Sequence, residues 1–181
     1  MTIEKVFVFV VFITANSVAV CEMLINDPSG VSITTELGIS DRYRILGDFN
    51  VDGIEDMAIS ADMNQFGSGG GEFTIYLCNA GGEYRKYGTF WSHPAVETIA
   101  IEKWGQNISL WTYSHLGGGT GSIGYYGMGE KGMSDRSSII IHPGDSGTAM
   151  GNALVESVFK NSDVVFKLER STTRDGKVEW K

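Results

Sequence analysis

Basic clusters, prolines and cysteines are all scarce in this sequence. Lysine and arginine number 14 against 22 aspartates and glutamates, and the formal net charge is −8. Because nucleic-acid-binding proteins gather Lys and Arg into patches, nucleic acid is not expected as a partner. The 3 prolines form no Pro-rich linker. The chain beyond its N-terminal segment, roughly 160 residues, therefore suits a single domain.

Long apolar runs are also scarce, and the one that stands out extends from Val6 to Val20. A membrane-spanning helix needs about 20 apolar residues, so this run is short for a span and matches the apolar region of a secretory signal peptide. Ser17-Val18-Ala19 supplies small residues for cleavage after Ala19. We therefore expect residues 1–19 to be a signal peptide and the mature chain to have no membrane span. An uncleaved N-terminal anchor and a buried first strand are the alternatives.

The two cysteines, Cys21 and Cys78, allow one disulfide bond in an exported protein. Cys21 follows the apolar run and is also a candidate for lipidation. A bacterial lipobox, however, has a small residue where this chain has Val20. The expected location is therefore periplasmic or extracellular, and a lipid anchor through Cys21 is the less favoured alternative to a bridge with Cys78.

Glycine is abundant, at 24 residues, and Val, Ile, Thr and aromatic residues fill the segments between glycines. This composition is typical of short strands joined by tight turns. Strands are expected at 57–60, 72–78, 84–91, 96–104, 108–115, 122–128, 137–142, 163–170 and 178–180, with 72–91 as a hairpin. One short helix is expected near 148–161. The expected fold class for residues 20–181 is a small single domain, mainly β, built of antiparallel sheets.

The segment from Asp48 to Asp56 has the spacing of a loop that wraps a hard cation. Oxygen-bearing side chains occupy its first, third, fifth and ninth positions, and glycine occupies its sixth. Calcium takes six to eight oxygen ligands at about 2.3–2.6 Å, and alternate residues of a tight loop supply them. Gly53 can adopt the positive φ that such a turn needs. The expected metal ligands are the side chains of Asp48, Asn50, Asp52 and Asp56 and the backbone carbonyl of Ile54.

Two other interpretations of this loop compete. An EF-hand has a bidentate Glu at its twelfth position and a helix on each side, but Ile59 stands there within an apolar run. A plain surface turn would also favour Asp and Asn. The crowding of Asp48, Asp52 and Asp56 favours a divalent cation, because the ion relieves the repulsion between their charges. We expect Ca²⁺ here to have a structural role.

The segment Gly47–Ile59 resembles the FG-GAP/VCBS-type repeat of integrin α-chain propellers and of many exported bacterial proteins. The resemblance continues in Ile75–Asn79 and Gly81–Tyr84, so it covers one repeat over about residues 44–90. It implies a four-stranded blade whose loop holds calcium through the five ligands named above. A propeller needs about four to eight blades, whereas this chain has a single Asp-x-Asn-x-Asp-Gly loop. One or two blades are therefore expected, rather than a closed propeller.

Two further patterns suggest other functions. Pro143–Gly147 looks like the nucleophile loop of chymotrypsin-type serine proteases, with Ser146 as nucleophile and His93 or His115 as its base. No sequence around either histidine resembles the His element of that family, and a simple turn accounts for the motif. Six aromatic residues could stack on sugars, although aromatics in strands are more often cross-strand partners. These are Trp91, Trp104, Trp111, Tyr113, Tyr125 and Tyr126.

We therefore expect an exported, non-enzymatic, β-rich protein with one structural calcium-binding loop and a binding or scaffolding role. No catalytic residue is assigned, and calcium is the expected cofactor. The expected partner is a protein or a glycan. The alternatives are a small secreted serine hydrolase that uses Ser146 and a carbohydrate-binding module that uses the aromatic residues.

Overall fold

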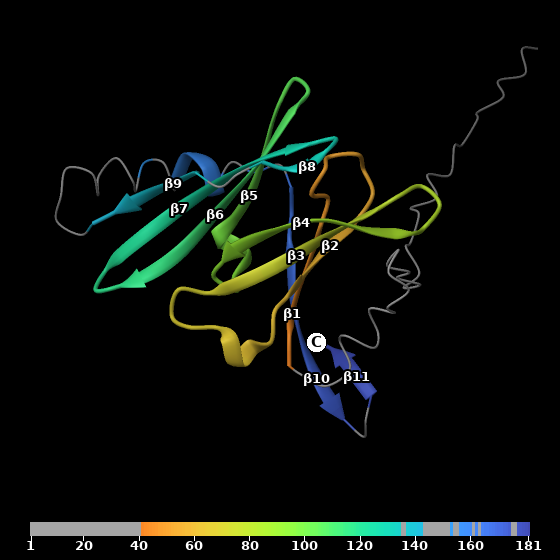
Figure 1. The fold of residues 1–181 in the computed structure, drawn as a ribbon, viewed down its shortest axis with the longest axis horizontal. Helices are drawn as coiled ribbons and strands as arrows, with labels where there is room; N and C mark the ends of the chain where they lie inside the picture. Colours follow the sequence, from red (N-terminus) through yellow and green to blue (C-terminus); the bar gives the residue numbers. More distant parts are fainter. Residues whose placement is uncertain are drawn as a thin grey trace, which may run out of the picture.

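The computed structural model describes residues 41–134, 137–142, 153, 156–160, 162, 164–174 and 177–181. Nearly all regular structure in these residues is β-strand, arranged in two sheets (Figure 1). The expected signal peptide, Cys21 and Ser146 lie outside the described residues.

The first sheet has six strands in the order β11-β10-β1-β2-β3-β4. β1 to β4 follow one another along the chain and pair as antiparallel neighbours. β10 returns from much later in the chain to pair with the other side of β1, and β11 forms a hairpin with β10. The strands are β1 Tyr43–Gly47, β2 Asp56–Ser60, β3 Gly71–Cys78, β4 Tyr84–Ser92, β10 Lys167–Arg174 and β11 Lys177–Trp180.

The second sheet has five strands, with β5, β6 and β7 as antiparallel neighbours. The outer side of β7 carries two short strands, because β9 pairs with its first half and β8 with its last residues. The strands are β5 Ile99–Trp104, β6 Asn107–Gly117, β7 Thr120–Gly129, β8 Gly132–Met133 and β9 Ser137–Ile141. Short 3-10 turns cover Met63–Gln65 and Val96–Thr98.

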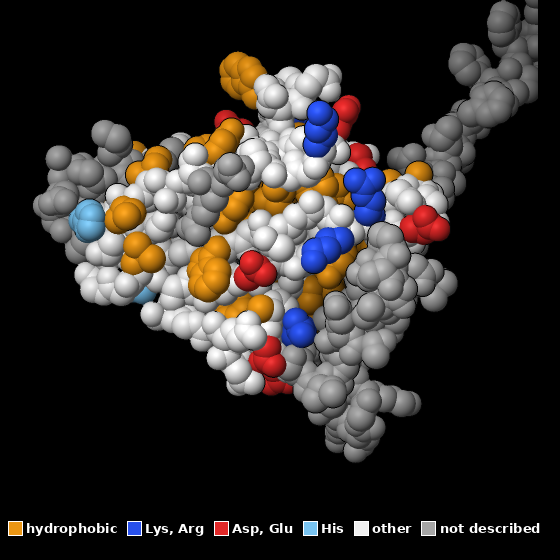
Figure 2. Space-filling view, viewed as in Figure 1, with side chains coloured by type: hydrophobic (Ala, Val, Ile, Leu, Met, Phe, Trp, Pro, Cys, Tyr) orange, Lys and Arg blue, Asp and Glu red, His pale blue; other side chains and the backbone are white. Residues whose placement is uncertain are grey.

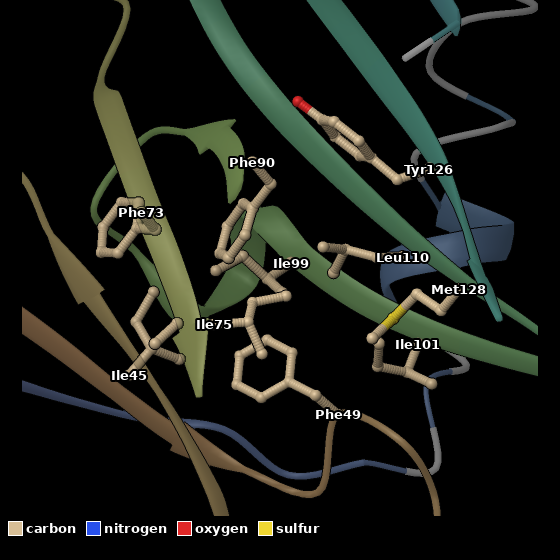
Figure 3. Packing of buried hydrophobic residues seen from close by; sticks show 11 residues of the cluster. Ile45, Phe49, Phe73, Ile75, Phe90, Ile99, Ile101, Leu110, Tyr126 and Met128 are labelled. Carbon is tan, nitrogen blue, oxygen red and sulfur yellow. The ribbon is translucent and has the colours of Figure 1, made fainter. Parts of the chain in front are cut away.

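Side chains from both sheets meet in one hydrophobic core (Figure 3). Phe73 and Phe90 stack with 5.3 Å between ring centroids, and Phe49 joins them 6.2 Å from Phe90. Burying a side chain such as Phe or Leu contributes about 1.5–3 kcal/mol, so this contact between the sheets stabilises the fold. The core residues are Ile45, Phe49, Ala58, Phe73, Ile75, Phe90, Ile99, Ile101, Leu110, Tyr126 and Met128.

The expectation of a small, mainly β domain of antiparallel sheets is confirmed. The strands and the hairpin expected from 57 to 91 are present as β2, β3 and β4, and residues 156–159 are helical within the segment 148–161. In the described part of the chain, the sheets do not close into a barrel. No helix there combines the length and apolar character that crossing a bilayer requires.

Three details differ from the expectations. The strand expected at 163–170 covers Lys167–Arg174, because its pairing with β1 begins at Lys167, and Phe166 packs on the core instead. The strand expected at 96–104 begins at Ile99, because the Thr98 hydroxyl donates to the Ala95 carbonyl and supports a 3-10 turn. β8 was not expected, since two residues are too short to show alternation.

Candidate metal site in the loop between β1 and β2

The expected calcium loop connects β1 to β2 at one end of the first sheet. Gly47, the last residue of β1, pairs with Asp56, the first residue of β2. Residues 48–55 therefore form the connection between the two strands. Gly53 has a φ of +88°, which confirms the positive φ expected there. Val51 also has a positive φ, of 56°. That conformation costs a residue with a side chain about 1–2 kcal/mol, so other interactions must hold the loop in this shape.

Asp48 reaches across the loop and accepts two backbone N–H groups. Its Oδ1 accepts from Asp52 N at 3.0 Å, and its Oδ2 accepts from Gly53 N at 2.8 Å. Asp52 in turn accepts from Asn50 Nδ2 and from Ile54 N, both at 2.8 Å. A carboxylate has about four lone-pair sites, so these bonds order the side chains and still leave acceptor capacity for a cation.

Asp56 lies at the base of the loop and is 0% exposed. Its Oδ1 accepts from Cys78 N at 2.8 Å, and its Oδ2 accepts from Phe49 N at 2.9 Å and from Asn50 N at 3.4 Å. Burial raises the pKa of this carboxyl to about 7; the Asp52 charge adds to the rise, and the backbone hydrogen bonds oppose it. Asp56 therefore ties the loop to the end of β3.

Cys78 is buried and disulfide-bonded at the end of β3. Its backbone N–H is the donor that Asp56 accepts. Its expected partner, Cys21, lies outside the described residues. The covalent link at Cys78 and the Asp56 carboxylate therefore act on the same short stretch of backbone.

Phe49 and Lys103 support the loop, although the spacing of the expected ligands predicts a role for neither residue. Phe49 anchors the loop in the core, where its ring centroid lies 5.1 Å from that of Phe166. Lys103 of β5 donates from Nζ to the Val51 carbonyl at 3.3 Å and links the loop to the second sheet. An aromatic residue within an acidic loop is a sequence signal that could have indicated the burial of Phe49. The Lys103 contact joins distant segments and leaves no local pattern.

The donor set of the loop suits calcium in its chemistry, because carboxylate, amide and carbonyl oxygens are the ligands of hard cations. Asp52 is exposed, and Asp48 and Asn50 are half-buried, so ions in solvent reach the loop. The side-chain oxygens bind backbone N–H groups in this structure. Within the described residues, no three or more His, Cys, Asp and Glu side chains are grouped to hold a metal ion. Calcium binding therefore requires these oxygens to turn towards a common centre.

A cleft of about 540 Å³ opens beside the loop, between the two sheets. Polar and charged groups, including Asp52, Arg85 and Glu130, line it together with apolar side chains such as Leu77 and Met128. Concave sites that combine apolar surface with a few polar groups are the usual form of a small-ligand site. The loop thus borders a space that a ligand or a partner's side chain can enter.

The residues of the serine hydrolase alternative are not brought together in the described structure. Ser146 lies outside the described residues. His93 and His115 are half-buried, and neither forms an ion pair with an acidic residue in the described part of the chain. A Ser-His-Asp triad depends on a carboxylate that orients the histidine, and no described contact supplies one.

The six aromatic residues do not form one platform. Tyr126 belongs to the core, where its hydroxyl accepts from Trp91 N at 3.0 Å. Trp104 is 80% exposed at the end of β5. Trp111 and Tyr125 are in contact, but their rings meet edge to face with centroids 4.8 Å apart. That arrangement offers a sugar less flat surface than two coplanar rings would.

Comparison with known proteins adds no relative. No family model, no curated protein and no solved structure matches this chain. Function is therefore inferred from the fold and from the loop between β1 and β2.

Proposed function

We propose that this protein is an exported, non-enzymatic binding or scaffolding domain of the FG-GAP/VCBS type, with one structural Ca²⁺ held by the loop from Asp48 to Asp56. The observation that carries the proposal is the hydrogen-bonded loop itself, in which Asp48 and Asp52 accept backbone N–H groups and the buried Asp56 closes the loop at its base. β1 to β4 lie in one antiparallel succession over the segment that resembles the repeat.

The charge balance of the loop supports a cation. Three aspartates stand within one turn, and among the described residues the basic group that contacts the loop is Lys103, which donates to the Val51 carbonyl. A divalent ion near Asp48, Asp52 and Asp56 would offset their mutual repulsion. The same ion would favour the ionised form of Asp56, whose burial otherwise disfavours the charge.

The position of the loop supports a structural rather than a catalytic role for the ion. Phe49 inserts into the core from the loop, and Asp56 binds the backbone of β3 at Cys78. An ion that fixes this loop would therefore also fix the position of Phe49 in the core and the contact of Asp56 with β3. Because calcium would bind the native state and not the unfolded chain, it would increase the free energy of unfolding by mass action, by about 2.7 kcal/mol at a hundred times Kd. The melting temperature would rise accordingly.

Calorimetric titration with Ca²⁺ and thermal melts with calcium or with chelator test the proposal on the mature protein. We expect heat of binding at one site and a rise in melting temperature, with Mg²⁺ less effective because it demands a tighter octahedral shell. Asp52→Asn should weaken calcium binding at least tenfold. Glu55→Gln is the matched control, because Glu55 is an exposed carboxylate of the same loop that is not an expected ligand.

An absence of binding heat together with an unchanged melting curve in millimolar calcium would remove the main support for the proposal. Equal effects of Asp52→Asn and Glu55→Gln would point to diffuse charge attraction instead of a site.

Export and the absence of activity have their own tests. The intact mass of the exported protein should correspond to a chain that starts at Val20, and retention of residues 1–19 would favour the uncleaved anchor. A fluorophosphonate probe should leave Ser146 unlabelled, and labelling would favour the hydrolase. A glycan array separates the two expected classes of partner, since binding there would favour a glycan over a protein.

A further inference from the structure

β2 is buried on both of its faces. All five of its residues are buried, although consecutive residues of a strand point to opposite faces of the sheet. Ala58 points into the core between the two sheets. Met57 and Ile59 therefore point to the outer face of the first sheet, where they are only 1% and 4% exposed. An antiparallel sheet with water on its outer face carries polar, exposed residues there, so this face has a cover.

The described residues around Met57 and Ile59 do not supply that cover. The hydrophobic side chains packed against the two residues are Leu46, Tyr76 and Tyr84, which belong to neighbouring strands of the same sheet. An apolar sheet face is buried against another layer, and the second sheet packs on the core side. The large hydrophobic side chains that are exposed among the described residues belong to none of β1, β2 and β3, and Figure 2 shows such side chains at the surface.

The disulfide bond at Cys78 ties another part of the chain to the same outer face. Cys78 pairs with Tyr84, which packs in the outer cluster, whereas Leu77 before it packs on the core side. Cys78 is disulfide-bonded, and Cys21 is the other cysteine of the sequence. The Cα atoms of a disulfide lie about 4.4–6.8 Å apart. The chain at residue 21 is therefore attached beside the outer cluster.

The chain must then travel the length of the sheet to reach β1. The strand pairing places Cys78 at the end of the sheet that carries the Asp48–Asp56 loop, and Asp41 at the opposite end. These ends are about seven residues of strand apart, or about 24 Å. Residues 22–40 lie outside the described part of the chain. Fully extended, they reach about 65 Å, so their length allows them to cross the outer face.

The sequence of residues 31–39 fits an extended segment with one apolar side. Val31, Ile33, Leu37 and Ile39 occupy alternate positions, which only Thr35 interrupts. The positions between them hold the polar or small residues Ser32, Thr34, Glu36 and Gly38. Such alternation is typical of a half-buried extended segment. Nine extended residues span about 30 Å, which is enough to cover the distance between the two ends of the sheet.

We propose that residues 31–39 lie extended across the outer face of the first sheet and cover Met57 and Ile59 with their apolar side. The Cys21–Cys78 bond holds one end of this cover, and the start of β1 holds the other. The first sheet thus lies between two layers, the second sheet and the chain's own N-terminal segment. This inference does not depend on calcium. It assigns the outer face to the chain itself, so a protein or glycan partner binds at another surface.

Peptide mapping without reductant tests the attachment on the mature protein. The peptides that contain Cys21 and Cys78 should be recovered as one linked species from a monomer. Two free thiols would overturn the proposal, and so would a bridge between two copies of the chain.

Methyl NMR on the oxidised mature protein tests the contact directly. We expect nuclear Overhauser contacts from Met57 or Ile59 to methyl groups of residues 31–39. The absence of all such contacts would overturn the proposal. Contacts that arise only between differently labelled copies in a mixed sample would place a second copy on the face and would overturn it as well.

Alanine substitutions test which side of the segment faces the sheet. Ile33→Ala and Leu37→Ala should each lower the urea midpoint of the oxidised protein by about 1 M, the shift expected when a buried side chain is truncated. Thr34→Ala and Glu36→Ala are the matched controls from the polar side and should change the midpoint little. Equal shifts for the two sides would overturn the proposed orientation and the cover with it.

Discussion

The backbone N–H of Cys78 donates to Oδ1 of Asp56 across 2.8 Å, and this bond joins the start of β2 to the end of β3. Both residues are buried, so neither the N–H nor the carboxylate can turn to water instead. The other oxygen of Asp56 holds the Phe49 N–H at 2.9 Å. One carboxylate therefore fixes the loop, β2 and β3 relative to one another.

Asp56→Ala should lower the free energy of unfolding by about 3 kcal/mol, because it leaves buried N–H groups of Phe49 and Cys78 without an acceptor. Urea unfolding of the calcium-free protein at neutral pH measures the loss. Asp62→Ala is the control, since Asp62 also accepts a backbone N–H, from Asn64, but at an exposed turn. A similar small loss from both variants would contradict a special role for Asp56.

Stability of the calcium-free protein should fall between pH 4 and pH 7 because of Asp56. Burial raises its pKa in the folded protein from 3.8 to about 7. The folded state therefore holds the proton more tightly than the unfolded chain. The resulting stabilisation is fully present below pH 3.8 and is lost as the pH rises through about 7. Urea unfolding across this pH range should show the slope.

Asp56→Asn is the variant that isolates this pH effect, since its side chain does not titrate. Its free energy of unfolding should vary less between pH 4 and pH 7 than that of the unsubstituted protein. Parallel profiles for the two proteins would show that other groups cause the slope.

Glu169→Gln should lower the free energy of unfolding by about 2 kcal/mol, because it leaves Arg44 half-buried without its charged partner. Glu169 is buried, ion-paired with Arg44, and 2.6 Å from Lys167 Nζ through its Oε1. Burial alone would raise the pKa of Glu169, but the hydrogen bonds and charges of Lys167 and Arg44 outweigh it and leave the pKa below 4.5. Chemical denaturation at pH 7 measures the loss.

The Glu169 contribution has the opposite pH dependence from that of Asp56. A carboxylate with a lowered pKa in the folded state stabilises above its ordinary value of 4.5, and this stabilisation is lost as the pH falls through the lowered pKa. Glu156→Gln is the control, because Glu156 pairs with Lys160 on an exposed surface, where ion pairs add little. An acid transition that Glu169→Gln leaves unchanged would contradict this assignment.

Gly53→Ala should abolish the stabilisation by calcium, whereas Gly82→Ala should preserve it. Both glycines have positive φ, +88° and +81°, and an added Cβ would have open space at either one. Each substitution should therefore cost about 1 kcal/mol through the backbone alone. Only Gly53 belongs to the proposed calcium loop. Thermal melts with and without calcium compare the two, and an equal calcium response would count against the site.

Local patterns made the strands and the loop predictable from sequence. The alternation in β3 and β4, and the spacing from Asp48 to Asp56, each lie within a few residues, where period and turn chemistry act directly. The spacing of the loop predicts Asp56 as one of five metal ligands and does not distinguish it from the others. Its burial depends on β3, which lies further along the chain.

Long-range contacts were not predictable in this way. The pairing of β10 with β1 and the contact of Lys103 with Val51 join segments that share no local pattern. Residues 163–166 alternate like a strand, yet Phe166 packs against Phe49 in the core without a strand partner. Alternation reports which side chains are buried and does not report which backbone they pair with.

The pairing of β1 with β10 has a consequence for the order of events during folding. Arg44 and Glu169 lie opposite one another across that pair, although most of the domain separates them along the chain. Contacts between distant segments form slowly, because the intervening chain must first be brought together. β1 therefore gains this partner only after residues 167–174 have been synthesised. Until β10 has been made, the side of β1 that faces away from β2 lacks this partner, and the first sheet is incomplete.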